Sequence, residues 1–257
     1  MRISKGDRQA FPELRGDLRA MRYPAWVEAK VDGELNWFVP GKEFPYLINK
    51  SGKIRYSFPI TKELSHINKR LLGELHWQDG KAKALYDFLE HQTDDELNFT
   101  VFDVDLPLPY LERRSWLIEN VSPTAHVRLV DASRIMSKDD VQLHYEHYVN
   151  VQGYEGIVVK SGDSRFIMGV SPWVKIKKKE TLDLEVISID PTQERIEVLV
   201  HNGPTSKPVG VKVMNKIKAT LKVGDIVEIE HQGILSKGGL RHPVFVRLRE
   251  DKCVSVK

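Results

Sequence analysis

Cysteine is almost absent from this chain: among its 257 residues there is one, Cys253. A single cysteine cannot form a disulfide within the chain, and it supplies no C-x-x-C pair for a zinc site. Disulfide frameworks belong to oxidising compartments, so we expect a reducing one. The sequence therefore predicts a cytoplasmic protein, encoded by either a cell or a virus.

Long apolar runs are also missing. No stretch approaches the roughly 18 apolar residues of a membrane-spanning helix. The first residues, MRISKGDRQAFPEL, lack the apolar segment of a secretory signal. Hydrophobic residues make up 41% and charged residues 29%, which is ordinary for a folded protein. We expect no membrane partner.

Charge of one sign is not in large excess. The formal net charge is +3 and the sequence pI is about 8.8. Such a mild excess is compatible with a nucleic-acid partner but does not require one, because the distribution of charge matters more than its total.

The pattern of hydrophobic residues changes along the chain. Up to about residue 179, strand-like segments alternate with helical ones, which predicts an α+β domain over 1–179. The expected strands are 26–31, 35–39, 45–49, 71–77, 98–104, 154–160 and 172–177, and the expected helices are Ile60–Leu71, Lys81–Glu90 and Ser137–Val149. After the basic run KIKKKE, only short strands and turns follow. Five such strands predict a small barrel of the OB type over 180–257.

The stretch EAKVDGEL, residues 28–35, places a lysine between two acids just before a glycine. On a strand, Val27 and Ala29 would face a core, while Glu28, Lys30 and Asp32 would share the other face. Such a face is usually solvated and charged. The alternative is a nucleophilic lysine, which requires a lowered pKa because the reference value is about 10.4.

The stretch WVKIK is a second unusual pattern. Trp173, Lys175 and Lys177 would share one strand face, with the two ammonium groups about 7 Å apart. Such a face either protects a sheet edge or binds a phosphate. Nearby cations would lower the pKa of Lys30, whereas carboxylates would raise it unless a divalent metal takes up their charge.

Several further side chains have the chemistry of a metal and nucleotide site. Glu74 in LLGELHW and Glu155 in YEGIVVK would supply oxygen ligands that suit Mg²⁺. Phe102 in FTVFDVDL could stack on a base. Taken singly, a glutamate is most often a surface residue and a phenylalanine most often a core residue. Arg249, Asp251 and Lys252 in RLREDK would by themselves be a solvated tail.

The order of these motifs is more informative than any one of them. KVDG, GEL, VFD, EGIVVK, WVKIK and a strand-rich tail ending in RLREDK follow one another from about residue 20 to 252. This order resembles that of the covalent nucleotidyltransferases, and the chain is most similar to the ATP-dependent DNA ligases. The tail GGLRHPVFVRLREDK resembles the ligase barrel more than that of the mRNA capping enzymes.

The resemblance implies a role for each matching position. Lys30 would attack the α-phosphate of ATP and become adenylylated, with Glu28 beside the adenine and Phe102 stacked on it. Gly33 would let the chain approach the ligand closely. Asp32 and Glu74 would lie near the ribose and the metal, Mg²⁺ or Mn²⁺, to which Glu155 would also bind. The phosphate-binding lysines would be Lys175 and Lys177, and the groups that orient the pyrophosphate would be Arg249, Asp251 and Lys252.

The sequence departs from the family pattern at three places. Leu35 stands where K-x-D-G-x-R has arginine, Lys50 replaces the arginine of S-R-x-G, and Gly169-Val170-Ser171 lacks the arginine of G-R-x-S. Lysine keeps the charge but loses the bidentate fork. We therefore expect altered DNA contacts, made by Lys50 and compensated by Arg55 or Arg165.

The function implied by the resemblance is the sealing of 5′-phosphate/3′-hydroxyl nicks in duplex DNA through a lysyl-AMP and a DNA-adenylate. We expect a monomer without the N-terminal helical DNA-binding domain of larger ligases and without a long barrel insertion. The second domain would close on the nucleotide through a hinge near Lys178–Leu182. Three alternatives stay open: an RNA ligase, a GTP-dependent capping enzyme, and a non-catalytic nucleic-acid binder.

Overall fold

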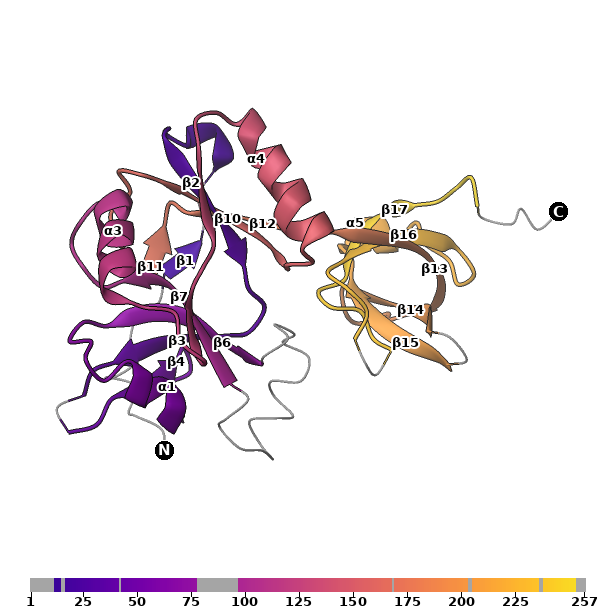
Figure 1. Cartoon of the computed structure of the whole chain (residues 1–257). Helices are drawn as coiled ribbons and strands as arrows, with labels where there is room; N and C mark the ends of the chain where they lie inside the picture. The colour runs from indigo at the N-terminus through magenta and orange to yellow at the C-terminus, as the bar shows by residue number, and fades with distance from the viewer. Residues whose placement is uncertain are drawn as a thin grey trace. The chain divides into compact units, whose positions relative to one another are not determined.

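The computed structural model describes residues 12–14, 17–41, 43–77, 97–167, 169–202, 205–235 and 238–252. The chain divides into two compact units, Met1–Ile176 and Lys177–Lys257. The first combines strands and helices, and the second is built mainly of strands (Figure 1).

The first unit contains a six-stranded sheet with the strand order β5-β4-β3-β6-β7-β8. All neighbours are antiparallel except β7 and β8. In β7, seven of eight residues are buried, as expected for a strand covered on both faces. The strands are β3 (Glu34–Val39), β4 (Tyr46–Asn49), β5 (Ile54–Arg55), β6 (Leu71–Trp77), β7 (Leu97–Val104) and β8 (Val127–Leu129).

A four-stranded sheet lies in the same unit, with the order β12-β10-β2-β9. On β2, Ala25, Val27 and Ala29 share the core face while Trp26, Glu28 and Lys30 share the other, as period-two patterning predicts, whereas β10 is buried along almost its whole length. A short parallel pair, β1 with β11, completes the strands of this unit. The bounds are β1 (Pro12–Leu14), β2 (Ala25–Lys30), β9 (Ala132–Ile135), β10 (Gly156–Ser161), β11 (Gly169–Ser171) and β12 (Val174–Lys177).

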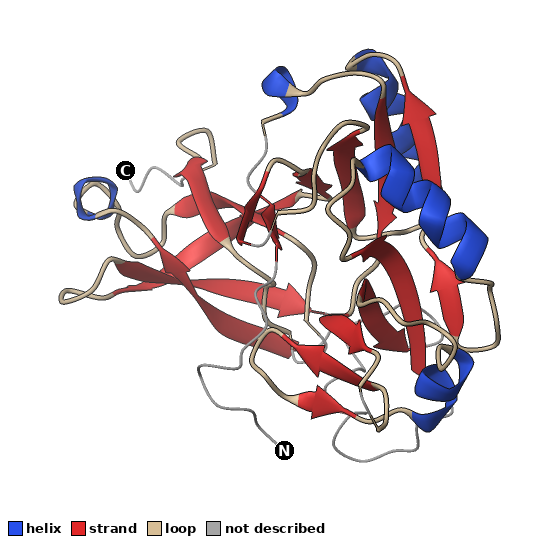
Figure 2. Ribbon diagram, turned by 90° about the vertical axis from the view of Figure 1, so that its left-hand side faces the viewer, coloured by secondary structure: helices blue, strands red, loops and turns tan. Residues whose placement is uncertain are grey.

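Helices cover the sheets from outside, as Figure 2 shows. Each sheet has its own apolar core: α1 and α3 contribute to the core of the six-stranded sheet, and α4 with the π-helical segment η4 to that of the four-stranded one. A short 3-10 turn, η2, precedes β2. The bounds are η2 (Leu18–Ala20), α1 (Phe58–Glu63), α3 (Tyr110–Asn120), α4 (Asp139–Tyr145) and η4 (Glu146–Val151).

Only the first third of the helix expected over Ile60–Leu71 is present. It ends at Glu63, and Leu71 already begins β6. Ile60, Leu64, Ile67 and Leu71 are nevertheless all buried in one core. The spacing therefore predicted correctly which side chains are buried. The residues after Glu63 reach the same core from a turn and from β6 instead of from a helix. The structure also has a helix, α3, that the sequence analysis did not expect, and the predicted helix Lys81–Glu90 lies outside the described residues.

The second unit holds a five-stranded antiparallel sheet with the order β15-β14-β13-β16-β17. Alternate side chains of these strands form a third apolar core. The outer strands β15 and β17 approach one another, but among the described residues no hydrogen-bonded ladder joins them. The elements are β13 (Glu180–Ile189), β14 (Arg195–Asn202), β15 (Thr205–Lys212), α5 (Asn215–Lys218), β16 (Ile226–His231) and β17 (Val244–Leu248).

Within the parts of the chain that the structure describes, no helix combines the length and apolar character needed to cross a membrane.

Candidate active site

The segment KVDG is the crossing between the two large sheets of the first unit. Lys30 is the last residue of β2, and β3 begins at Glu34 in the other sheet. Antiparallel pairing places Lys30 opposite Gly156, the first residue of β10. Glu155 therefore precedes the partner strand at this same end. Its Oε2 lies 2.5 Å from the Nζ of Lys30, whose side chain is 20% exposed.

The environment of Lys30 is dominated by acids. Burial lowers the pKa of its amine, but the charges of Glu74, Glu155 and Asp32 together outweigh burial, so the pKa is raised above its usual value. The lysine is thus an ammonium ion near neutral pH. A nucleophilic amine must lose that proton, so the acids have to be neutralised before Lys30 can attack an electrophile.

Glu74 shows the same excess of negative charge. Burial raises the pKa of its carboxyl to about 7, and Glu155 and Asp32 add to this effect. Lys30 and the backbone N–H of Gly33 act in the opposite direction. The pKa of Glu74 is thus raised mainly by burial, and the two neighbouring acids are a further cause.

A divalent cation fits this charge surplus. Among the described residues no three His, Cys, Asp or Glu side chains converge as a ready-made metal site. Mg²⁺ rarely uses an all-protein cage, and it usually combines one or two carboxylates with water and substrate phosphates. Glu74, Glu155 and Asp32, all of which act on Lys30, have the oxygen chemistry for that mode.

Gly33 is required by packing within the protein. A Cβ atom there would lie 2.4 Å from the carbonyl oxygen of Leu75 and 2.8 Å from the Cγ of Glu74. The glycine thus lets the crossing segment lie directly against β6, where Glu74 is located. The close approach to a ligand expected at Gly33 stays a prediction.

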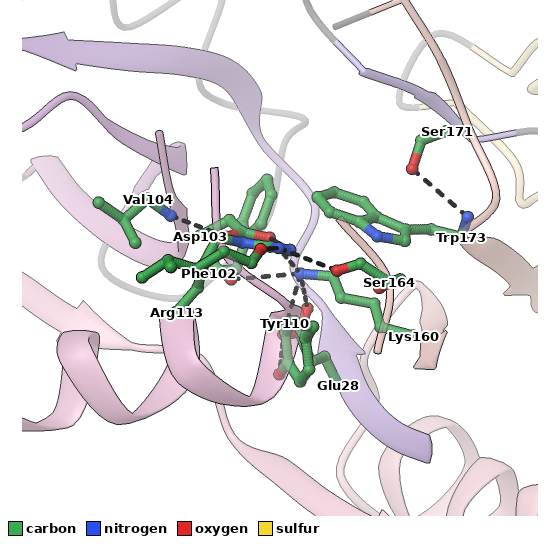
Figure 3. Close-up of polar contacts among 11 residues, drawn as sticks. Glu28, Phe102, Asp103, Val104, Tyr110, Arg113, Lys160, Ser164, Ser171 and Trp173 are labelled. Atoms are coloured by element: carbon green, nitrogen blue, oxygen red, sulfur yellow. Dashed lines mark hydrogen bonds and ion pairs between the residues drawn. The ribbon is translucent and has the colours of Figure 1, made fainter. Parts of the chain in front are cut away.

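Glu28 faces a buried polar cluster two residues before the lysine (Figure 3). It is 2% exposed and contacts Tyr110 of α3 and Lys160 of the neighbouring strand β10. Its Oε1 accepts a hydrogen bond of 2.6 Å from the hydroxyl of Tyr110 and one of 3.0 Å from the Nζ of Lys160. Its Oε2 lies 2.8 Å from the same Nζ. The carboxylate is therefore fixed from two elements.

The cluster continues to Asp103, which lies on β7. Arg113 pairs with its two oxygens at 2.6 and 3.1 Å, and Lys160 lies 3.4 Å from one of them. The guanidinium also donates to the carbonyls of Leu108 and Ser164. All of these charged side chains are buried, so their mutual pairing is what makes burial tolerable.

Tyr110 and Arg113 were missed by the sequence analysis. With Leu117 they occupy positions i, i+3 and i+7 of α3, which share one buried helix face. The segment PYLERRSWLIEN carries that spacing, but its charged residues conceal it. Lys160 was visible at the end of EGIVVK without an assigned role.

Phe102 is half-buried and packs both against the core of the four-stranded sheet and against a small cluster of Trp37, Ile48 and Leu72 on the six-stranded sheet. Its ring centroid is 5.0 Å from the Nζ of Lys160. A partly exposed ring next to this cluster can act as a stacking surface.

The strand WVKIK does not present three side chains on one open face. Trp173 precedes β12 and is 1% exposed, with its ring 4.1 Å from the Nζ of Lys160. Lys175 is exposed, whereas Lys177 is half-buried and donates to the Oε1 of Gln232 at 3.3 Å, within the second unit. The boundary between the two units falls between these two lysines.

The three residues assigned to DNA contacts have different environments. Arg55 is buried and directs its guanidinium fork at both oxygens of Glu34, at 2.7 and 2.8 Å. Arg165 is exposed and donates to the carbonyl of Pro107. Lys50 is exposed in the turn after β4. Only Lys50 and Arg165 of these three therefore present their charge at the surface.

The RLREDK residues form an ion cluster inside the second unit. Arg249 donates to both oxygens of Asp183 at 2.7 and 2.8 Å, and also pairs with Asp251 at 2.8 Å. Lys252 lies 2.6 Å from Asp183. Hydrogen bonding from Arg249 lowers the pKa of Asp251 to about 2. Asp183, which lies on β13, was not singled out by the sequence analysis.

The family of this chain is shown by its match to a protein-family model. The family model for the ATP dependent DNA ligase domain matches residues 9–177, which include Lys30, Glu74, Phe102 and Glu155. The chain belongs to this ligase family. The motif order thus identified the family correctly.

Two curated relatives are DNA ligases. DNA ligase 4 of Candida glabrata is 31% identical over 96 residues, which cover 34% of this chain and 10% of that protein. DNA ligase of Archaeoglobus fulgidus is 25% identical over 288 residues, covering 95% of this chain and 46% of that protein. This ligase-family chain therefore spans less than half of each curated relative.

The fold is also that of known ligases. A solved structure of a Lig E DNA ligase, described as binding DNA with a minimal scaffold, matches 94% of this chain and 99% of its own with a TM-score of 0.74. The sequence identity is 16%, so this likeness supports the fold alone.

Proposed function

We propose that this chain is an ATP-dependent DNA ligase that seals 5′-phosphate/3′-hydroxyl nicks in duplex DNA through AMP bound covalently to Lys30. The observation that carries the proposal is the position of Lys30. It is the half-buried terminal residue of β2, paired with Glu155 and influenced by Glu74 and Asp32, within the segment that matches the ligase family.

In the first step, the Nζ of Lys30 attacks the α-phosphorus of ATP. A P–N bond forms, the P–O bond to pyrophosphate breaks, and the amine releases its proton. AMP then passes from Lys30 to the 5′-phosphate of the nick. Attack by the 3′-hydroxyl finally forms the phosphodiester bond and releases AMP. Each step transfers a nucleotidyl or phosphoryl group, so positioning and charge neutralisation dominate catalysis.

The remaining residues have auxiliary parts in this proposal. Glu74, Glu155 and Asp32 would offer the carboxylates for Mg²⁺, one or two of them binding the ion together with water and substrate phosphates, and the ion would neutralise phosphate charge. Glu28 and Phe102 would contact the adenine, and Lys175 and Lys177 the phosphates. Arg249, Asp251 and Lys252 would orient the pyrophosphate.

The domain assignment also belongs to the proposal. Residues 1–179 would form the adenylation domain and residues 180–257 the OB-type domain. The antiparallel order of five strands and the approach of β15 to β17 are compatible with a small, partly open barrel. The proposed active form is a monomer.

The test is the intact mass of the protein after incubation with ATP and Mg²⁺. The result expected is a gain of one AMP, absent in Lys30→Ala and retained in Lys53→Ala, which removes an exposed lysine of the same unit. Charged protein is then given nicked DNA, nicked RNA and hybrid duplexes. A mass gain with GTP alone would indicate a capping enzyme, and no gain with either nucleotide would refute the proposal.

A further inference from the structure

Glu28 is held by more contacts than a solvent-facing glutamate needs. An ionised carboxylate offers about four lone-pair sites. Tyr110 and Lys160 occupy two of them on Oε1, and Lys160 occupies one on Oε2. One acceptor site therefore remains, on Oε2.

The cluster also fixes the charge of Glu28. Two cations, Lys160 and Arg113, balance two anions, Glu28 and Asp103, in a region where all four are buried. The ammonium of Lys160 lies 4.1 Å from the ring centroid of Trp173 and 5.0 Å from that of Tyr110, so aromatic faces surround it. The ammonium of Lys160 and the hydroxyl of Tyr110 both donate to Glu28, so this carboxylate is the acceptor in each of these contacts. An ionised Glu28 can accept hydrogen bonds but cannot donate them.

We propose that Tyr110 and Lys160 are positioning residues that hold Glu28 as a fixed hydrogen-bond acceptor, and that they thereby set the preference of the site for a purine with a 6-amino group. The inference rests on the proposed function, in which Glu28 lies beside the base. A 6-amino group donates to such an acceptor, whereas the 6-oxo group of guanine or hypoxanthine presents a second acceptor and is repelled.

The geometry separates this role from simple packing. The hydroxyl of Tyr110 lies 2.6 Å from Glu28, whereas its ring packs 5.8 Å from the ring of Trp26. Tyr110→Phe keeps the ring and removes the hydroxyl alone. Tyr148→Phe is the matched control, because Tyr148 is also buried and its hydroxyl lies 3.1 Å from Ser133, away from Glu28.

The experiment measures lysyl-nucleotide formation in a single turnover with three triphosphates: ATP, purine riboside triphosphate, which lacks the 6-amino group, and inosine triphosphate, which has a 6-oxo group. For Tyr110→Phe, we expect kcat/KM for ATP to fall about tenfold, the size associated with one hydrogen bond to a charged group. The loss should appear in KM, and kcat/KM for purine riboside triphosphate should be nearly unchanged. Tyr148→Phe should affect all three nucleotides equally.

A second variant tests the charge. Lys160→Met keeps the length of the side chain but leaves Glu28 and Asp103 with one cation. Glu28 then loses the donor that contacts both of its oxygens and is no longer held in place, so the ratio of inosine triphosphate to ATP use should rise at least tenfold. If this variant does not fold, Tyr110→Phe decides alone.

Equal losses for ATP and purine riboside triphosphate in Tyr110→Phe would overturn the inference, since a purely structural tyrosine would act on both. That result is distinct from failure of the proposed function, in which the unaltered protein forms no lysyl-nucleotide from any triphosphate and the inference falls with it.

Discussion

The Nζ of Lys30 lies 2.5 Å from the Oε2 of Glu155, across the paired ends of β2 and β10. This ion pair helps to keep the amine of Lys30 protonated, and a protonated amine is not a nucleophile. The same acids that hold the proton would bind the cation that releases it, because a divalent metal and Lys30 compete for the same negative charge. The free protein is therefore expected to be unreactive until nucleotide and metal arrive together.

The first prediction concerns the pH dependence of lysine adenylylation. The pKa of Lys30 is raised in the free protein, so kcat/KM for ATP should increase with pH through neutrality. Glu155→Gln removes one of the charges that raise this pKa and should move the rising limb to lower pH, while lowering the maximal rate because a metal ligand is lost. Single-turnover formation of lysyl-AMP between pH 6 and 10 measures the position of the rising limb and the maximal rate. If the rate rises over the same pH range in the unaltered protein and in Glu155→Gln, this explanation is contradicted.

The second prediction concerns Glu74 and stability. Its pKa is about 7 in the folded protein, against an ordinary value of 4.5, so the folded state favours the protonated carboxyl. The folded state therefore loses stability as pH rises from about 4.5 to 7, and the penalty is complete above 7. At about 1.4 kcal/mol per pKa unit, Glu74→Gln should stabilise the protein by up to ~3 kcal/mol at pH 8 and leave it unchanged at pH 4.

Urea unfolding at the two pH values measures this difference. All five tryptophans precede residue 177, so their fluorescence reports on the first unit. Glu119→Gln, on the exposed side of α3, is the control and should show no such pH dependence. The stabilised Glu74→Gln should also charge with AMP more slowly. Equal stabilisation at both pH values would rule out the electrostatic explanation.

A third prediction separates Arg55 from DNA binding. Arg55→Met leaves the buried carboxylate of Glu34 without its cation, which should lower the free energy of unfolding by about 3 kcal/mol. Arg19→Met, which breaks the exposed pair with Asp17, should cause no measurable change.

Lys50→Ala is the complementary variant for DNA. If Lys50 contacts a phosphate, its removal should weaken binding of nicked duplex uniformly across sequences and reduce the salt slope by about 1. Folded Arg55→Met should keep the slope of the unaltered protein. A reduced slope for Arg55→Met would mean that Arg55 leaves Glu34 and contacts DNA.

The fourth prediction concerns the RLREDK end. Arg249→Ala should slow lysine charging by ATP by about 100-fold, as expected for a lost cation at a developing charge, yet leave the sealing of a pre-adenylylated nick largely intact. Arg247→Ala is the control, because Arg247 lies near the same strand end but pairs with Glu228. This variant should slow neither lysine charging nor the sealing of a pre-adenylylated nick. We expect Arg249→Ala to fold, because Lys252 still pairs with Asp183 in this variant. Circular dichroism tests whether it does. Equal losses in both steps would assign Arg249 to DNA binding or to structure.

Much of the fold followed from local patterning. The alternation of side chains on β2 and the strands expected over 71–77, 98–104 and 154–160 are properties of these segments themselves, and the structure has strands at these places. The period-3.6 pattern at Ile60–Leu71 showed which side chains are buried, but could not show that the chain turns after Glu63. Burial depends on the whole core, whereas the path of the backbone depends on where the next strand begins.

The sequence by itself determined the order of motifs, the alternation that places Glu28 and Lys30 on one face, and hence the family and the proposed nucleophile. Tertiary structure alone decided which charges meet. It paired Lys30 with Glu155, directed Arg55 to Glu34 instead of the surface, and brought Tyr110 and Lys160 to Glu28 from segments 82 and 132 residues away. Residue types and spacing within one strand or helix are local, but electrostatic pairing depends on distances that exist only after the sheets have packed.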